Sequence, residues 1–283
     1  NFFKNSAIGE VVSQFKLRAS YGVVGNNQGI ASYASSSFYD AGLNGTNPTL
    51  FYAQAGNKNL TWETSKKTDF GLNFGLFNDR ITGELGYYKN NIDGLILSVP
   101  QATSTGIPDS SILTNIGSMN NTGYEVTLNA KILSEGAFKW NASVNITTQK
   151  NVVTALDANN SDIIVATSLE KTNIIRVGES IGNFFIVQTG GVNPANGRRI
   201  FYYGDGTAVQ YDHSAPVASR WTKVIDGSVT RAANQAVDAK VSGPALPTYF
   251  GGLSNTFMYK GFDLSASLYF SGGNYVYNGT KAG

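Results

Sequence analysis

The single histidine, His213, is the first residue to consider for hydrolytic chemistry. It lies in the segment Tyr211-Asp212-His213-Ser214, so any Ser-His-Asp hydrolase in this chain would have to use it. The segment is polar and lacks the strand-turn-helix context of a nucleophile elbow. A lone surface histidine is the favoured interpretation, and we predict no catalytic residues and no enzyme activity.

Carboxylates offer two further kinds of chemistry. Glu84 and Glu125 could form the acid pair of a glycosidase, but each alternates with apolar neighbours, as on one face of a β-strand. The segment from Asp157 to Asp162 has oxygen ligands at calcium-like spacing, without the glycine and distal glutamate of an EF-hand loop. The chain has no cysteine, which excludes thiolate metal sites and disulfides. We therefore expect no metal and no cofactor.

A group of aromatic residues is the best candidate for ligand contact. These rings lie in the longest irregular segment, among glycine and aspartate, where they could stack on sugar faces while nearby polar groups form hydrogen bonds. The same rings could instead pack the segment against itself or against a partner protein, and the sequence leaves that alternative open. The candidate ligand-binding residues are Phe201, Tyr202, Tyr203, Tyr211 and Trp221.

The composition narrows the class of protein. Only 14% of the 283 residues are charged and 32 are glycine, whereas about a quarter are charged in ordinary soluble proteins. The net charge is +2 and no long basic run exists, so nucleic acid is not an expected partner. The longest apolar runs are far shorter than the roughly 18 residues of a membrane-spanning helix.

Strict alternation of apolar and polar residues recurs along the chain. In the first instance Phe15, Leu17 and Ala19 alternate with Lys16 and Arg18. A period of two places alternate side chains on opposite faces of a β-strand. The predicted strands cover residues 15–23, 68–77, 80–88, 124–132, 138–147, 249–259 and 262–270.

Three tight turns indicate how these strands pair. Paired residues must share a face, and two-residue turns at 78–79 and 260–261 and a three-residue turn at 134–136 satisfy this condition. The predicted cross-strand pairs are Leu76 with Ile81, Leu72 with Leu85, Asn73 with Glu84, Tyr259 with Phe262, Leu253 with Leu268, Ile132 with Phe138, Ala130 with Trp140, and Val126 with Val144.

The tight turns alternate with long irregular segments at residues 25–65, 90–123 and 151–246. This plan is typical of an outer-membrane β-barrel, whose strands cross the bilayer in about 9 to 11 residues. A soluble β-sandwich is the alternative, but polar faces rich in Asn, Ser and Thr favour a lumen. We predict an all-β, antiparallel, transmembrane barrel segment of about seven to nine strands. The predicted lumen-facing residues are Arg18, Asp69, Asn73, Arg80, Glu84, Glu125, Asn129, Asn141 and Asn145.

Several segments of the chain resemble those of SusC-like TonB-dependent transporters. The first is FKLRASYGVVGN at residues 15–26, which resembles a strand and loop start of that family. The others follow in the family's order and together cover nearly the whole chain. They are NLTWET at 59–64, the segment 69–90, NIGSMNNTGYE at 115–125, RVGESIGNFF at 176–185 and the closing segment 247–278.

The resemblance implies an importer in the outer membrane of a Gram-negative bacterium, surrounded by outer-membrane lipid and built as a barrel of about 22 strands. It implies oligosaccharide or peptide cargo, a SusD-like surface lipoprotein as a lid, and energy from the TonB-ExbB-ExbD complex. Residues 1–283 would be part of the barrel domain, without the plug, the TonB box, the signal peptide and the last strands. The alternatives are a non-transporting binding or adhesion protein and, more remotely, an outer-membrane enzyme.

Overall fold

The computed structural model describes residues 7–28, 30–107, 110–166 and 171–278. These residues form two compact units. The first unit comprises the described parts of 1–163, 176–180 and 247–273, and the second those of 164–175, 181–246 and 274–283.

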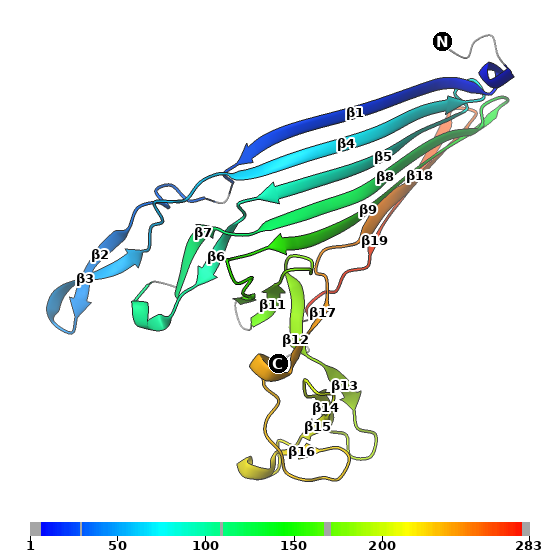
Figure 1. The fold of residues 1–283 in the computed structure, drawn as a ribbon. Coiled ribbons are helices and arrows are strands. Elements are labelled where there is room, and N and C mark those ends of the chain that lie inside the picture. The colour runs from blue at the N-terminus through cyan, green and yellow to red at the C-terminus, as the bar shows by residue number, and fades with distance from the viewer. Residues whose placement is uncertain (1–6, 29, 108–109, 167–170, 279–283) are drawn as a thin grey trace. The chain divides into compact units, whose positions relative to one another are not determined.

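A seven-stranded antiparallel sheet dominates the first unit (Figure 1). Its strands lie side by side in the order in which they occur along the chain, which confirms the predicted meander. The sheet is open, with β1 and β19 at its edges. The strands are β1 (Val12–Asn26), β4 (Glu63–Leu76), β5 (Ile81–Asp93), β8 (Ser118–Leu133), β9 (Phe138–Ala155), β18 (Tyr249–Tyr259) and β19 (Phe262–Gly272).

Two of the predicted hairpin registers are confirmed. Leu72 lies opposite Leu85, and Leu253 lies opposite Leu268. The β18–β19 turn is the predicted two-residue turn, with left-handed residues at Lys260 and Gly261. The β4–β5 turn has the predicted central residues Asn78 and Asp79, because the Arg80 N–H donates a 3.2 Å hydrogen bond to the Phe77 carbonyl. Residues 77, 78 and 79 all have positive φ, and Leu76 lies opposite Ile81 as predicted.

The predicted β8–β9 register is wrong by two residues. Val126 lies opposite Ile146 rather than Val144, and Ala130 lies opposite Ala142 rather than Trp140. A bulge between Lys131 and Leu133 takes up one extra residue next to the turn, which is four residues long. Because the shift is two residues, the faces of both strands remain as predicted.

One face of this sheet is apolar and exposed. Leu17 is 70% exposed and Leu264 is 65% exposed, although both belong to the alternating apolar set. An apolar surface that extends over seven strands is suited to contact with hydrocarbon rather than water. Within the described residues, no helix has both the length and the apolar character needed to cross a membrane.

Aromatic rings gather toward both ends of the apolar face. Near the long connections, the Tyr87 and Tyr124 ring centroids are 5.3 Å apart. Near the short turns, Trp140 and Phe257 stack at 5.7 Å. Rings at two levels are typical of the interfacial girdles of membrane barrels.

The long connections in the first unit carry hairpins of their own. These are β2 (Phe38–Asn44) with β3 (Asn47–Gln54), and β6 (Ile96–Pro100) with β7 (Ser111–Asn115). Asn115 links β7 to the chain before β4, because its side chain accepts the Thr61 N–H and donates to the Thr61 and Gly94 carbonyls. Glu63 accepts the N–H of Ile96 in the same region. Asn115 and Glu63 both lie in segments that resemble the family, at 115–125 and 59–64. Their side chains therefore hold together the backbone where the long connections meet the sheet.

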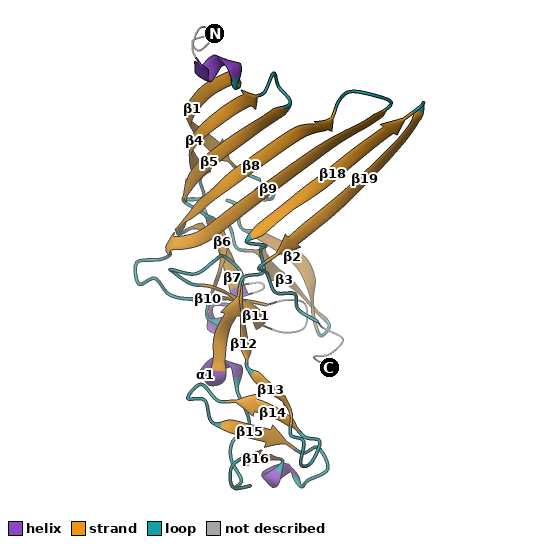
Figure 2. Ribbon diagram, turned by 90° about the vertical axis from the view of Figure 1, so that its right-hand side faces the viewer, coloured by secondary structure: helices purple, strands orange, loops and turns teal. Residues whose placement is uncertain are grey.

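The second unit contains two small four-stranded sheets (Figure 2). One consists of β10 (Ile163–Ala166), β11 (Lys171–Ile175), β12 (Asn183–Val187) and β17 (Ala239–Gly243). The other consists of β13 (Thr189–Val192), β14 (Arg199–Tyr202), β15 (Ala208–Tyr211) and β16 (Trp221–Lys223), and the one-turn helix α1 (Gln235–Asp238) precedes β17. Ile174 and Val209 are completely buried in this unit. The segment predicted as a long irregular loop thus has its own folded core.

Candidate functional site

The polar face of the large sheet carries most of the residues predicted to face a lumen. Arg18 on β1 forms an ion pair with Glu84 on β5, and Asn73 donates a 3.1 Å hydrogen bond to the same carboxylate. Arg18 reaches β5 by passing over Gly71 of β4, where an added Cβ would collide with the Arg18 side chain. Both charged groups are more than one-third exposed, so their pairing contributes about 0 to 1 kcal/mol of stability.

Further polar pairs extend this face across the neighbouring strands. Ser20 donates a 3.2 Å hydrogen bond to Asp69, and Ser143 donates one of 2.7 Å to Asn129. The register places the remaining predicted residues on the same face, at Glu125 opposite Thr147, Asn145 opposite Thr127, and Asn141 opposite Lys131. The sheet therefore presents a wall of alternating donors and acceptors.

Arg80 lies at the turn end of this wall, where it borders a hollow together with Asn129 and Asn141. It belongs to the β4–β5 turn, and its guanidinium donates to the backbone carbonyls of Lys131 and Ile132 at 3.1 and 2.7 Å. The side chain thereby ties the turn to the bulged end of β8.

Three of the five candidate ligand-binding aromatics lie together in the second unit. The Trp221 ring centroid is 5.3 Å from that of Phe201 and 5.1 Å from that of Tyr211. Each ring comes from a different strand, and the pairing of Tyr211 with Trp221 places both on one face. All three side chains are half-buried, which leaves part of each ring accessible. Below, these three rings are called the aromatic cluster.

His213 extends the aromatic cluster at its exposed side. Its ring lies 6.3 Å from that of Tyr211, and Nδ1 is 3.4 Å from the Tyr211 hydroxyl oxygen. The arrangement can stack against a sugar ring or a peptide side chain and offers polar groups at its margin.

Tyr202 and Tyr203 occupy different environments. Tyr203 is buried, its hydroxyl donates to the Arg231 carbonyl, and the Arg231 guanidinium stacks 3.9 Å from the ring centroid. Tyr202 is 36% exposed and borders a polar hollow together with Gln188 and Lys240. Both residues were predicted from the sequence as ligand-binding candidates. Of the two, Tyr202 is exposed and Tyr203 is buried.

A buried carboxylate at Asp238 organises this part of the second unit. It is 1% exposed and accepts two hydrogen bonds from Arg231, at 2.6 and 2.7 Å. It also accepts the backbone N–H groups of Asn234 and Gly204. The Arg231 guanidinium holds the pKa of Asp238 well below its usual range. No periodic pattern in the sequence links Asp238 to Arg231, so this pair could not be predicted from the sequence.

The calcium-like segment uses its oxygens internally. Asp157 accepts the backbone N–H groups of Ser161 and Asn159 at 2.7 and 3.1 Å, and the Ser161 bond lowers the Asp157 pKa. Asp162 forms an ion pair with Arg176 at 2.7 Å. Across the described part of the chain, no group of three or more histidine, aspartate or glutamate residues could hold a metal ion.

A family model described as TonB dependent receptor-like, beta-barrel, matches residues 7–282. Two TonB-dependent receptors of Formosa agariphila are 30% and 32% identical to this chain, over 99% and 95% of its length. The TonB-dependent receptor SusC of Bacteroides thetaiotaomicron is 28% identical over 98% of the chain. The chain spans only about a quarter of each relative, at 27%, 26% and 26% of their lengths.

Solved structures share the fold. The structure described as the RagAB peptide transporter matches with a TM-score of 0.74 and 23% identity, over 96% of this chain and 28% of that one. At this identity the match concerns the fold alone. The family and fold inferred from the sequence are confirmed by these matches.

Proposed function

The chain belongs to the family of TonB-dependent receptor-like β-barrels, and we propose that it forms part of the wall of a nutrient importer in the outer membrane of a Gram-negative bacterium. The observation that carries this proposal is the two-faced seven-stranded sheet. Its exposed apolar face suits lipid, and its opposite face bears hydrogen-bonding side chains, as in the wall of a water-filled lumen.

The polar face is suited to solute passage rather than to chemistry. Arg18 and Glu84 on this face neutralise each other, and most of the other residues assigned to the face are neutral amides and hydroxyls. Neutral donors and acceptors exchange hydrogen bonds with water and solute at little cost. We assign Arg18, Asp69, Asn73, Arg80, Glu84, Glu125, Asn129, Asn141 and Asn145 to the lumen wall, and we assign no catalytic role to His213.

The proposed cargo is an oligosaccharide or a peptide. The structure described as the RagAB peptide transporter, which shares the fold, supports a peptide. An oligosaccharide is what the resemblance to SusC-like transporters implies. In the same proposal a SusD-like lipoprotein covers the extracellular mouth, and the TonB-ExbB-ExbD complex energises uptake through a part of the protein beyond this chain. The alternative, a surface protein that binds its ligand without importing it, shares the same wall.

Import is tested with the full-length protein in its own cells. A strain lacking the gene should lose uptake of a fluorescently labelled oligosaccharide or peptide pool, and the intact gene should restore it. Inactivating TonB should also stop uptake while surface binding persists. If label binds the surface but uptake is unchanged by loss of either gene, the protein is a binder rather than an importer.

Within this proposal the aromatic cluster contacts cargo. Replacing Trp221 with alanine should weaken cargo binding to the full-length protein about tenfold, equivalent to roughly 1.4 kcal/mol, because a stacking surface is lost. Trp221→Phe should retain most of the affinity, since it keeps a ring between Phe201 and Tyr211. Isothermal titration with the purified cargo measures the change.

Ile225 supplies the matched control for this test. It lies in the same unit and is 88% exposed, so Ile225→Ala removes a large apolar side chain away from the aromatic cluster. The full-length protein with Ile225→Ala should bind cargo with the affinity of the wild type. Unchanged affinity in Trp221→Ala would remove the aromatic cluster from the cargo site.

A further inference from the structure

Above the aromatic girdle, the apolar face of the sheet carries lysines. Tyr87 lies opposite Tyr124, and two residues further toward the long connections Lys89 lies opposite Thr122. Thr122 in turn lies opposite Lys150 on β9. Since residues two apart on a strand share a face, Lys89 and Lys150 point to the same side as the two tyrosines.

These two lysines flank a single strand at one level. β5 and β9 lie on either side of β8, so the two backbones are about 10 Å apart. Both side chains are exposed. Neither forms an ion pair with a described residue.

The acidic group nearest in the register is already neutralised. Asp93 lies four residues after Lys89 on β5 and therefore shares its face of the sheet. Its carboxylate forms a 2.9 Å ion pair with Lys66 of β4. The surroundings of the two lysines are the ends of β4, β5, β8 and β9 that lie between the level of Tyr87 and Tyr124 and the long connections. Among the described residues there, the register places no other aspartate or glutamate on this face. Among the described residues, these two positive charges therefore have no ion-pair partner, and they lie just above the apolar surface.

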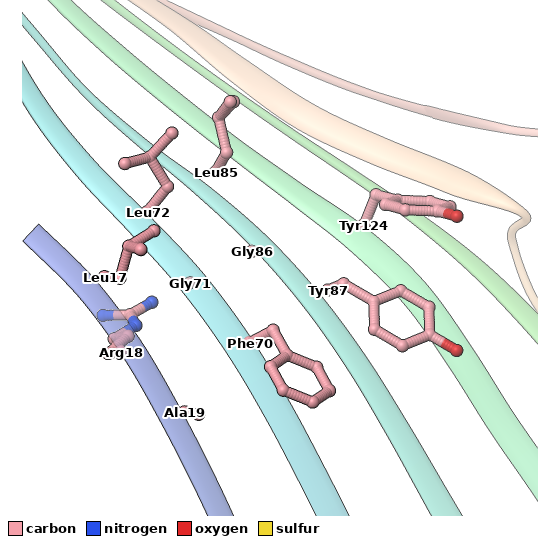
Figure 3. Close-up of a pocket in the computed structure, with 10 residues that line it drawn as sticks. All are labelled: Leu17, Arg18, Ala19, Phe70, Gly71, Leu72, Leu85, Gly86, Tyr87 and Tyr124. Carbon is pink, nitrogen blue, oxygen red and sulfur yellow. The ribbon is translucent and has the colours of Figure 1, made fainter.

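A shallow hollow of about 620 Å³ lies beside the tyrosines on the same face (Figure 3). It spans β1, β4, β5 and β8, and Figure 3 shows the side chains that border it. Its apolar lining consists of Leu17, Ala19, Phe70, Leu72, Leu85, Tyr87 and Tyr124. Tyr87 is two residues, about 7 Å, from Lys89 along β5.

We propose that Lys89 and Lys150 bind the phosphate of an anionic membrane lipid whose acyl chain lies in this hollow. The lysines match the charge of the headgroup, and the apolar lining continues from the lysine level into the hydrocarbon region. A phosphorylated lipid satisfies both parts at once, whereas a free anion uses only the lysines. The inference rests on the place of the sheet in a membrane wall and is independent of the cargo.

Native mass spectrometry of the full-length protein in detergent tests this site. The probes are phosphatidylglycerol, which is anionic, and phosphatidylcholine, which is zwitterionic. Wild-type protein should retain phosphatidylglycerol preferentially, and Lys89→Gln/Lys150→Gln should reduce this preference about fivefold for each lysine removed. Lys89→Arg/Lys150→Arg should restore it, and unboiled electrophoresis shows that each variant is folded.

The matched control changes two lysines on the opposite face. Lys16 and Lys67 lie on β1 and β4, and their register places them with the polar set. Lys16→Gln/Lys67→Gln removes the same charge and should leave phosphatidylglycerol retention unchanged. Equal loss in both double variants, or equal retention of the two lipids by the wild type, would overturn the proposal.

Inorganic phosphate separates a lipid site from a general anion site. At millimolar concentration it should not displace phosphatidylglycerol, because it cannot occupy the hollow. Ala19→Phe adds a ring to the hollow and should lower phosphatidylglycerol retention, although both lysines remain. Complete displacement by phosphate, or no effect of Ala19→Phe, would contradict a lipid whose chain lies in the hollow.

Discussion

Replacing Gly123 with alanine is expected to abolish the accumulation of folded protein in the outer membrane. Gly123 lies on β8 between β5 and β9, and an added Cβ would overlap the Thr148 carbonyl oxygen and the Tyr88 hydroxyl. The Thr148 carbonyl belongs to the backbone of a paired strand, so it cannot move aside without breaking the ladder. Overpacking of this kind costs about 1 to 3 kcal/mol, and more where the backbone is the obstacle.

The amount of folded full-length protein is read from unboiled electrophoresis of the membrane fraction, where a closed barrel migrates faster than unfolded chain. Gly22→Ala is the matched control. Gly22 also lies within a strand of the sheet, but a Cβ there meets no heavy atom within 4 Å. Its yield should match that of the wild type, and equal yields of both variants would show that the close approach at Gly123 is not limiting.

Asp238→Ala is expected to unfold the second unit locally while the seven-stranded sheet persists. The change leaves the Arg231 charge and the backbone N–H groups of Gly204 and Asn234 without their acceptor. Breaking a pair with one completely buried partner costs about 3 kcal/mol or more. Hydrogen exchange should therefore accelerate in β14, β15 and β17, but not in β4 or β5.

Asp226→Ala serves as the control for Asp238. The Asp226 carboxylate is exposed and accepts hydrogen bonds from Ser228 in its own turn. Its removal should change exchange within that turn alone. If Asp238→Ala leaves exchange in β14 and β17 unchanged, the buried pair does not stabilise the unit.

The Asp238 network also predicts a dependence on pH. The pKa of Asp238 is lowered in the folded state, chiefly by its hydrogen bonds to Arg231. Its contribution to stability is therefore complete above the unfolded value of about 4 and is lost as the pH falls through the folded pKa. The difference in exchange between wild type and Asp238→Ala should be constant from about pH 5 to 8 and shrink below about pH 4. If this difference in exchange already falls between pH 8 and 5, a titratable group other than Asp238 is responsible for the pH dependence.

The sequence by itself determined the seven strands of the large sheet and their faces. A side-chain period of two is a local property, so Leu17 and Arg18 could be assigned to opposite faces without knowing their neighbours. Glycine at position 261 also marked its turn, because the turn requires positive φ there. Segments that resemble those of SusC-like transporters, in the same order along the chain, then indicated the family.

Only the tertiary structure decided features that depend on residues far apart. The bulge at Lys131 and Leu133 has no local signature, so the β8–β9 register could not be predicted correctly. The loop of residues 151–246 lacks periodicity, because its short strands bury their side chains against distant segments. The pairing of Arg231 with Asp238 and the separation of Tyr203 from Trp221 are therefore invisible along the chain. Local periodicity determines which face a side chain occupies, whereas register and clustering arise from packing between segments.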